Sequence, residues 1–475
     1  MKIIRLMLFV LIPLLFFYGC DLYEDLFDPT DVHNPSITEE NLLDNSRGGA
    51  EPLLVGLRYS LSDAVGQTTV FTDVTSDNYD NTFTFLSNII DVPRDITPTD
   101  NDLDDERNIY FELQTLHAKS LFGINVVLPN DADATSEQWA EVYFHKGMAL
   151  LMLSENFAAF PIEENGPAVR GEDAIDVAIS DLKTSIQYDP GYDNSVRCRI
   201  ALARAYRLNG DAVNAALESN NALALSTDYV MLTPYDATNL RNYFYTFAVD
   251  RTSDDMQPLP RLDFLDPKYT SREAGIPILK SEEAYLILAE VSLFNSNLSD
   301  AKNQMINAIE LATNRGSELF NDASDPRTNR PNSDTMLVKA DATSDAIAGL
   351  IVERGTSTLI SAYPISYTSL TTAYINSLTT SEELYRALYL LRQEIFFGEG
   401  RRMSDLGIRL PVMNRQIDAN PNINPGDYGT YVVVPDYIPQ GDVLDAFTID
   451  GNIVTIAYDM NKLIAQNISV VSPFK

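Results

Sequence analysis

The sequence predicts a mainly α-helical protein with a helical-hairpin scaffold, long loop-rich excursions and minor short strands. Two observations support this class. Stretches within residues 136–225, and again within 281–314, place apolar residues at the spacing of amphipathic helices. Over residues 316–380 that period stops, and turn-forming residues together with Tyr, Ser and Thr take over. With 475 residues, 45% of them hydrophobic, the chain has ample apolar material for a core.

The first twenty residues have the layout of an export signal. Lys2 and Arg5 precede an uninterrupted apolar run from Leu6 to Tyr18, and Gly19 precedes Cys20. This run is shorter than the ~20 residues that cross a bilayer core, which disfavours a permanent membrane span. A small residue followed by cysteine resembles the lipobox of bacterial lipoproteins, in which the cysteine becomes the lipidated first residue of the mature chain.

We therefore expect a signal peptide over residues 1–19 and a lipidated acidic tether over residues 20–45. Acyl chains on Cys20 would anchor the protein stably, because each buried methylene contributes about 0.8 kcal/mol. A plain secreted chain is the alternative. The remainder, residues 46–475, is expected to form a single domain.

The predicted scaffold helices come in successive pairs. The apolar spacing places them within residues 136–160, 171–187, 194–210, 211–225, 280–297 and 299–314. The second helix of each pair carries two small residues about two turns apart, which are Ala178 and Ser185, Ala215 and Ala222, and Ala301 and Ala308. Small residues let a partner helix approach closely. The step from Ala178 to Ala215 is close to the ~34-residue period of a tetratricopeptide repeat, so a tetratricopeptide-like scaffold is predicted.

The C-terminal segment, residues 381–475, is predicted to be one helix followed by a tail. Beyond Pro411 the pattern is that of loop and short strand, including the alternating stretch NIVTIAY.

The charge balance argues against nucleic acid as a partner. The formal net charge is -34, whereas binding to nucleic acid requires clustered Lys and Arg. The same acidity argues against electrostatic adhesion to anionic lipid, so the membrane contact is expected only through the Cys20 lipid.

Sequence signatures of catalysis and metal binding were not found. The three histidines, His33, His117 and His145, form no zinc motif. Asp100, Asp102 and Asp104 alternate as in a calcium loop, but Asp105 and Phe111 occupy the places where an EF-hand needs Gly and Glu. Binding of a structural calcium ion is an alternative that no motif supports. We expect no catalytic residues, no cofactor and no enzymatic activity.

Aromatic residues beside amides and carboxylates in the polar loops suggest a ligand surface. Such residues suit sugar rings, whose faces stack on aromatics while their hydroxyls take directional hydrogen bonds. The candidates are Tyr79, Asn81, Phe83, Tyr243, Tyr245, Tyr363 and Tyr367. The competing interpretation is that these aromatics pin the loops to the scaffold. The region over residues 316–380 is expected to lie on the ligand side.

The stretch RQEIFFGEGRRMSDL joins an amphipathic helix to a charged cluster. Gly398 and Gly400 let the backbone turn at the end of the helix. Arg402 is expected to pair with Glu399, Asp405 or exposed carbonyls, because a guanidinium forms fixed forked hydrogen bonds. We interpret Glu399, Arg402 and Asp405 as a structural cluster.

This stretch is similar to the late motif of the SusD/RagB family of outer-membrane nutrient-binding lipoproteins, a helix ending in Phe-x-Glu-Gly-x-Arg followed by Asp-Leu. SEEAYLILAEV resembles the preceding helix of that family, and YIPQGDVL its terminal Ile-Pro-x-x-Glu turn, with Asp442 where Glu is usual. The resemblance is specific mainly in residues 281–310 and 384–442.

The resemblance implies a SusD-like fold and a non-catalytic protein on the outer membrane, lipid-anchored and facing the exterior. It also implies capture of nutrient oligosaccharide and its delivery to a TonB-dependent, SusC-like transporter. A peptide-binding homologue and a tetratricopeptide-like scaffold for another protein are the alternatives, and an exported hydrolase is the least favoured.

Overall fold

The computed structural model describes residues 48–82, 86, 89–105, 107–250, 256–322, 330–355 and 359–475. The predicted signal peptide, the acidic tether and Cys20 lie outside the described residues. Within the described part, no helix is both long and apolar enough to cross a membrane.

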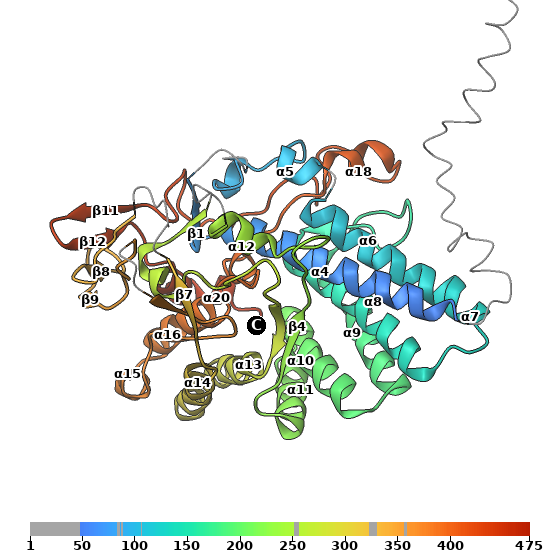
Figure 1. Cartoon of the computed structure of the whole chain (residues 1–475), viewed down its shortest axis with the longest axis horizontal. Helices are drawn as coiled ribbons and strands as arrows, with labels where there is room; N and C mark the ends of the chain where they lie inside the picture. The colour runs from blue at the N-terminus through green and yellow to red at the C-terminus, as the bar shows by residue number, and fades with distance from the viewer. Residues whose placement is uncertain are drawn as a thin grey trace, which may run out of the picture.

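Consecutive helical hairpins form the scaffold, as predicted. They are α8 (Ser136–Asn156) with α9 (Gly171–Tyr188), α10 (Tyr192–Leu208) with α11 (Ala212–Leu225), and α13 (Ser281–Phe294) with α14 (Leu298–Thr313). Contacts of α9 with α10 and of α11 with α13 stack the hairpins into one array. In Figure 1 this array curves from α8 and α9 towards α14 and α16.

Additional long helices extend both ends of the array. At one end, α4 (Ala50–Val74) and α6 (Ile109–Phe122) pack against each other and against α8. At the other end, α16 (Ser381–Ile395) packs on α13 and α14. The helix predicted for the C-terminal segment is therefore part of the scaffold.

The small residues of the repeats lie where helices meet. All of Ala178, Ser185, Ala215, Ala222, Ala301 and Ala308 are buried, as are the residues between them, Leu182, Ser219 and Met305. The approach of α8 to α9 is close at Gly147, where an added Cβ would lie 2.8 Å from Leu182 Cγ. Small side chains thus set the spacing of the hairpins, which confirms the helix-packing argument made from the sequence.

Short elements complete the fold. The remaining helices are α5 (Asn101–Asp104), α7 (Leu128–Asn130), α12 (Tyr243–Ala248), α15 (Thr372–Ser377), α17 (Arg402–Asp405), α18 (Asn414–Ala419), α19 (Met460–Gln466) and α20 (Ile468–Val471), with the 3-10 helices η1 (Pro93–Asp95) and η3 (Pro260–Leu265) and the π-helical turn η2 (Gly123–Val127). The expectation of loop and short strand beyond Pro411 is therefore incomplete, because α18, α19 and α20 lie there.

The strands are short and mostly paired two by two. Antiparallel pairs join β1 (Tyr79–Asn81) to β5 (Met256–Pro258), β2 (Ala159–Phe160) to β3 (Val169–Arg170), β4 (Val230–Thr233) to β6 (Ile276–Lys280), and β7 (Glu318–Asn321) to β10 (Leu359–Ala362). A four-stranded sheet has the order β11 (Phe447–Asp450), β12 (Ile453–Ile456), β8 (Leu337–Lys339), β9 (Ala346–Ala348). It lies at the α15 and α16 end of the array (Figure 1).

Candidate functional site

The chain reverses direction between α16 and α17 through two glycines. Gly398 and Gly400 have φ angles of +68° and +71°, in the left-handed region that favours glycine. A Cβ on Gly400 would lie 3.3 Å from Thr68 Cγ2 of α4, and one on Gly398 would lie 3.2 Å from the ring of Phe244. Both the backbone conformation and the close packing therefore require glycine at this turn.

Arg402 is buried and forms a two-pronged ion pair with Asp77, which lies just beyond the end of α4. Its Nη2 donates to Asp77 Oδ2 at 2.8 Å, and its Nη1 donates to Asn461 Oδ1 at 2.9 Å. Burial alone would lower the pKa of this guanidinium, but Asp77 raises it. The expected pairing of Arg402 with Glu399 or Asp405 is wrong. Its Nε and Nη2 both donate to Asp77, which is far away in the sequence.

Asp405 and Glu399 have other partners. Asp405 accepts two hydrogen bonds from Arg392, at 2.7 and 2.9 Å. Burial opposes ionisation of Asp405, yet the guanidinium of Arg392 holds its pKa below the usual value. Glu399 Oε1 accepts from Lys268 Nζ at 2.9 Å and from Lys280 Nζ at 2.6 Å. The cluster thus joins α16 and α17 to distant segments.

The same lysines fix a loop that precedes α15. Lys280 Nζ donates to the carbonyl of Ile365 at 2.9 Å, and Lys268 Nζ donates to the same carbonyl at 3.1 Å. Burial lowers the pKa of Lys268 to about 8. Glu394 of α16 accepts from the Thr368 hydroxyl at 2.6 Å and from the Ser369 amide at 2.8 Å. Buried charges therefore set the position of residues 365–369.

This fixed loop presents two stacked tyrosines. The rings of Tyr363 and Tyr367 lie 4.0 Å apart between centroids with an interplanar angle of 12°, and both side chains are half-buried. Phe264 of η3 meets Tyr367 edge-on at 6.2 Å. Burial raises the pKa of the Tyr363 hydroxyl above its usual value.

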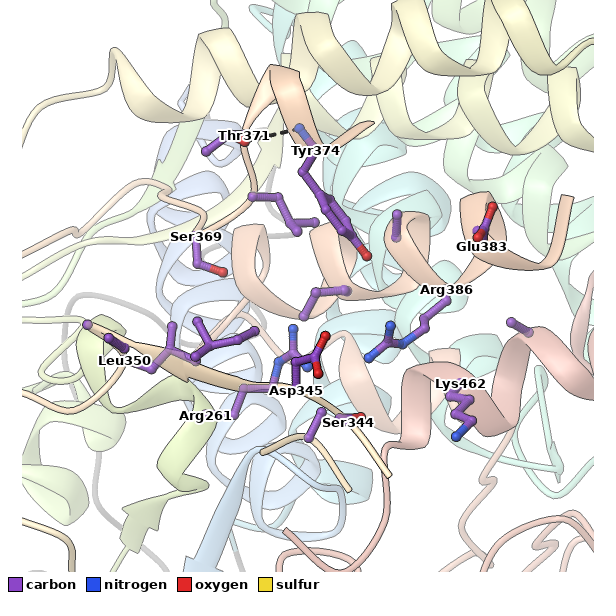
Figure 2. Close-up of a pocket in the computed structure, with 18 of the residues that line it drawn as sticks. Arg261, Ser344, Asp345, Leu350, Ser369, Thr371, Tyr374, Glu383, Arg386 and Lys462 are labelled. Carbon is purple, nitrogen blue, oxygen red and sulfur yellow. Dashed lines mark hydrogen bonds between the residues drawn. The ribbon is translucent and has the colours of Figure 1, made fainter. Parts of the chain in front are cut away.

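A cavity of about 880 Å³ opens beside Tyr367. Its walls come from η3, the β8–β9 hairpin and the turn after it, the fixed loop, α15, α16 and α19. Figure 2 shows Tyr374 of α15 projecting towards the centre of the cavity from the side opposite Arg261, Ser344 and Asp345. Aromatic, hydroxyl and charged groups thus share one concave surface.

Three of the six charged side chains that line the cavity have partners in the protein. Arg386 donates to Asp459 at 2.8 Å, and although burial opposes it, Asp459 raises the pKa of this guanidinium. Lys462 donates to Asp341 at 2.8 Å. Glu383 caps α16, and amide hydrogen bonds from residues 379 and 380 lower its pKa to about 2.

Solved structures resemble this arrangement over most of the chain. A SusD superfamily protein from Bacteroides fragilis superposes with a TM-score of 0.54 at 12% identity, over 80% of this chain and 100% of the other. A SusD superfamily protein from Bacteroides vulgatus gives 0.54 at 12% identity, over 79% and 98%. This chain has the SusD-like fold.

A candidate sugar-binding protein from Bacteroides vulgatus is similar to the same extent. It superposes with a TM-score of 0.53 at 15% identity, over 80% of this chain and 98% of its own. No protein-family model and no curated protein matches the sequence. At these identities the likeness establishes the SusD-like fold, and the chemistry of the cavity has to be argued from its own residues.

Within this SusD-like fold only part of the predicted ligand surface comes together. Tyr367 lines the cavity and Tyr363 stacks behind it, whereas Phe83 lies outside the described residues. Tyr243 and Tyr245 are half-buried on α12 and do not line the cavity, and Asn81 is a buried residue of β1. Arg261, Arg386 and Lys462 also line the cavity, but they belong to no motif that would mark them in the sequence.

Tyr79 belongs to the core of the SusD-like fold. It is fully buried, stacks on Phe397 at 5.0 Å, meets Phe244 edge-on at 5.2 Å and donates to Asp266 at 2.8 Å. Its ring is closed to ligand, which corrects its place among the candidates and agrees with the competing interpretation that loop aromatics pin the loops.

One group of carboxylates could hold a metal ion. Ligand atoms of Asp80, Asp91 and Asp445 lie within 4.8 Å of one another. Burial, with neighbouring carboxylates, raises the pKa of Asp91 to about 8 and that of Asp445 well above its usual value. This group is separate from the predicted alternation of Asp100, Asp102 and Asp104, where Asp100 instead caps α5.

Proposed function

We propose that the chain is a non-catalytic, lipid-anchored binding protein of the SusD/RagB family. It captures nutrient oligosaccharide at the exterior face of the outer membrane and delivers it to a TonB-dependent, SusC-like transporter. The observation that carries the proposal is a large aromatic and polar cavity held by buried ion pairs in a SusD-like fold.

The cavity suits a saccharide in size and chemistry. Ligand pockets commonly measure roughly 300–1,000 Å³, and this one measures about 880 Å³. Tyr367 offers a ring face. The Ser369 hydroxyl donates to Glu394 and can still accept from a sugar hydroxyl, and the Thr371 hydroxyl accepts from the Tyr374 amide and can still donate to one. The similar sugar-binding candidate from Bacteroides vulgatus supports the same class of ligand.

The anchor is proposed from Cys20 and the signal-like segment before it. Tethering supports the function because it raises the effective concentration of the binding protein at the transporter, so weak contacts with each sugar unit suffice. Mass spectrometry of the mature chain would show an acylated Cys20. Co-purification from membranes would recover the transporter with the full-length protein.

The test of binding is a glycan array followed by calorimetry on the leading oligosaccharide. We expect Tyr367→Ala to weaken binding roughly 10-fold or more, since aromatic contacts contribute about 0.5–1.5 kcal/mol beyond the burial of their area. Tyr192→Ala is the matched control, because Tyr192 is exposed on α10 outside the cavity.

Three results would overturn this proposal. Binding of peptides without any glycan would favour the peptide-binding homologue. Release of reducing ends from a glycan mixture would identify a hydrolase. Equal affinity of the Tyr367→Ala variant and the wild type would place the glycan elsewhere.

A further inference from the structure

Arg261 stands apart from the other cations of the cavity. It lies on η3, lines the cavity and is only 7% exposed. Its Nε is buried and has no hydrogen-bond partner, and among the described residues no hydrogen bond or ion pair of Arg261 is found. Burying a guanidinium without a partner is costly, so such a group is rarely kept in a core for stability alone.

The carboxylates nearest in sequence are committed to other arginines. Asp263, on the same 3-10 helix, accepts from Arg354 Nη2 at 3.4 Å, and Asp266 accepts from Arg330 at 3.2 Å. Across the cavity, Arg386 and Lys462 pair with Asp459 and Asp341. Among the described cations that line the cavity, Arg261 is thus the one without an ion-pair partner.

We propose that Arg261 receives an oxyanion of the ligand, so that the cavity selects acidic saccharides bearing carboxylate or sulfate groups. This inference rests on the proposed glycan-binding function and deepens it. A guanidinium binds a planar carboxylate or a sulfate edge through two parallel hydrogen bonds, which gives orientation as well as affinity. The ring of Tyr367 and the hydroxyl of Tyr374 face the same cavity and can hold the sugar that carries the charge.

The carboxylates that line the cavity do not oppose this assignment. Asp345 and Glu382 are exposed, where water and salt screen their charges. Glu383 is bound by the backbone amides at the start of α16. Because Arg261 is buried, its attraction for an anion is screened less than the repulsion from these exposed carboxylates, although the whole chain carries a formal charge of -34.

The test compares matched charged and neutral probes on the intact lipid-free protein by calorimetry. The probes are an oligogalacturonide and its carboxyl-reduced form, and a chondroitin sulfate oligosaccharide and its desulfated form. We expect at least one charged probe to bind roughly 10- to 100-fold more tightly than its neutral counterpart, the effect of charge-assisted hydrogen bonds. The preference should weaken as salt is raised.

Two variants assign the preference to Arg261. Arg261→Gln is expected to abolish the preference while retaining affinity for the neutral probe, and Arg261→Lys to restore part of it. Thermal melts should show no loss of stability in Arg261→Gln, because the variant removes an unpaired buried charge. Arg170→Gln is the control, since Arg170 is exposed and does not line the cavity.

The outcomes distinguish a failure of the Arg261 assignment from a failure of the proposed glycan binding. If charged and neutral probes bind the wild type equally, or if Arg261→Gln keeps the preference, the assignment of Arg261 is wrong while glycan binding stands. If no probe and no array glycan binds at all, both the assignment and the proposed function are wrong.

Discussion

Lys280 Nζ donates a hydrogen bond of 2.6 Å to the buried carboxylate of Glu399. The same ammonium donates to the carbonyl of Ile365 at 2.9 Å, in the loop that presents Tyr367 to the cavity. A motif that looks purely structural in the sequence therefore determines where the wall of the cavity lies. Stability and ligand affinity should therefore both fall when the contact between Lys280 and Glu399 is removed.

Glu399→Gln is the first test of that link. Removing one partner from a buried ion pair costs about 3–5 kcal/mol, because the remaining charges stay buried and uncompensated. We expect urea denaturation to show a loss of that order, together with weaker glycan binding in the protein that remains folded. Glu172→Gln is the control, because Glu172 pairs with Arg170 on the surface. A normal stability with Glu399→Gln would contradict the structural role of the Lys280 contact.

Arg402→Ala should act on stability alone. Arg402 holds Asp77 and Asn461, and none of these side chains lines the cavity. We expect a loss of about 3–5 kcal/mol in the free energy of unfolding and an unchanged dissociation constant for glycan. Calorimetry combined with thermal melts measures both. Stability that holds while binding vanishes would give Arg402 a direct part in the site.

The pair formed by Arg402 and Asp77 also predicts non-additive mutations. Asp77→Ala should destabilise the protein about as much as Arg402→Ala, and the double variant should cost clearly less than the sum, because no unpaired charge is left behind. A double-mutant cycle measures the coupling. Strictly additive losses would show that the two side chains do not act on each other.

The carboxylates around Asp91 predict a pH dependence of stability. Burial raises the pKa of Asp91 to about 8 in the folded protein, whereas an unfolded aspartate titrates near pH 4. The folded state therefore binds more protons at Asp91 between these values, so the contribution of Asp91 to stability is fully present below about pH 4 and is lost as pH rises towards 8.

Asp91→Asn should remove this contribution. In a chelating buffer, which keeps divalent cations off the cluster, we expect the variant to melt at a higher temperature than wild type at pH 8 and to differ little at pH 4. Asp173→Asn, an exposed change in the first turn of α9, serves as the control. An advantage of equal size at both pH values would rule out titration of Asp91 as its cause.

The scaffold could be predicted from local patterns. The small residues Ala178, Ala215 and Ala301 mark helix contacts because close packing leaves no room for larger side chains. The spacing of small residues along the sequence therefore predicts these contacts. The turn at Gly398 and Gly400 is readable for the same reason, since it depends on backbone conformation at those positions alone.

The site could not be predicted in the same way. The partner of Arg402 is Asp77, which approaches only after α4 and α17 have packed together, and nothing local distinguishes Asp77 from other carboxylates. Arg261, Arg386 and Lys462 reach the cavity from η3, α16 and α19, three segments separated in the chain. Conversely, Tyr79 looked like a loop aromatic because its neighbours are polar, yet Phe397 and Phe244 enclose it.

Whether the cavity beside Tyr367 binds the glycan can be seen in a crystal structure of the protein soaked with its tightest-binding oligosaccharide. We expect sugar density in the cavity, with a ring against Tyr367 and a charged substituent at Arg261. Sugar bound instead over Tyr243 and Tyr245 of α12, with the cavity empty, would contradict it.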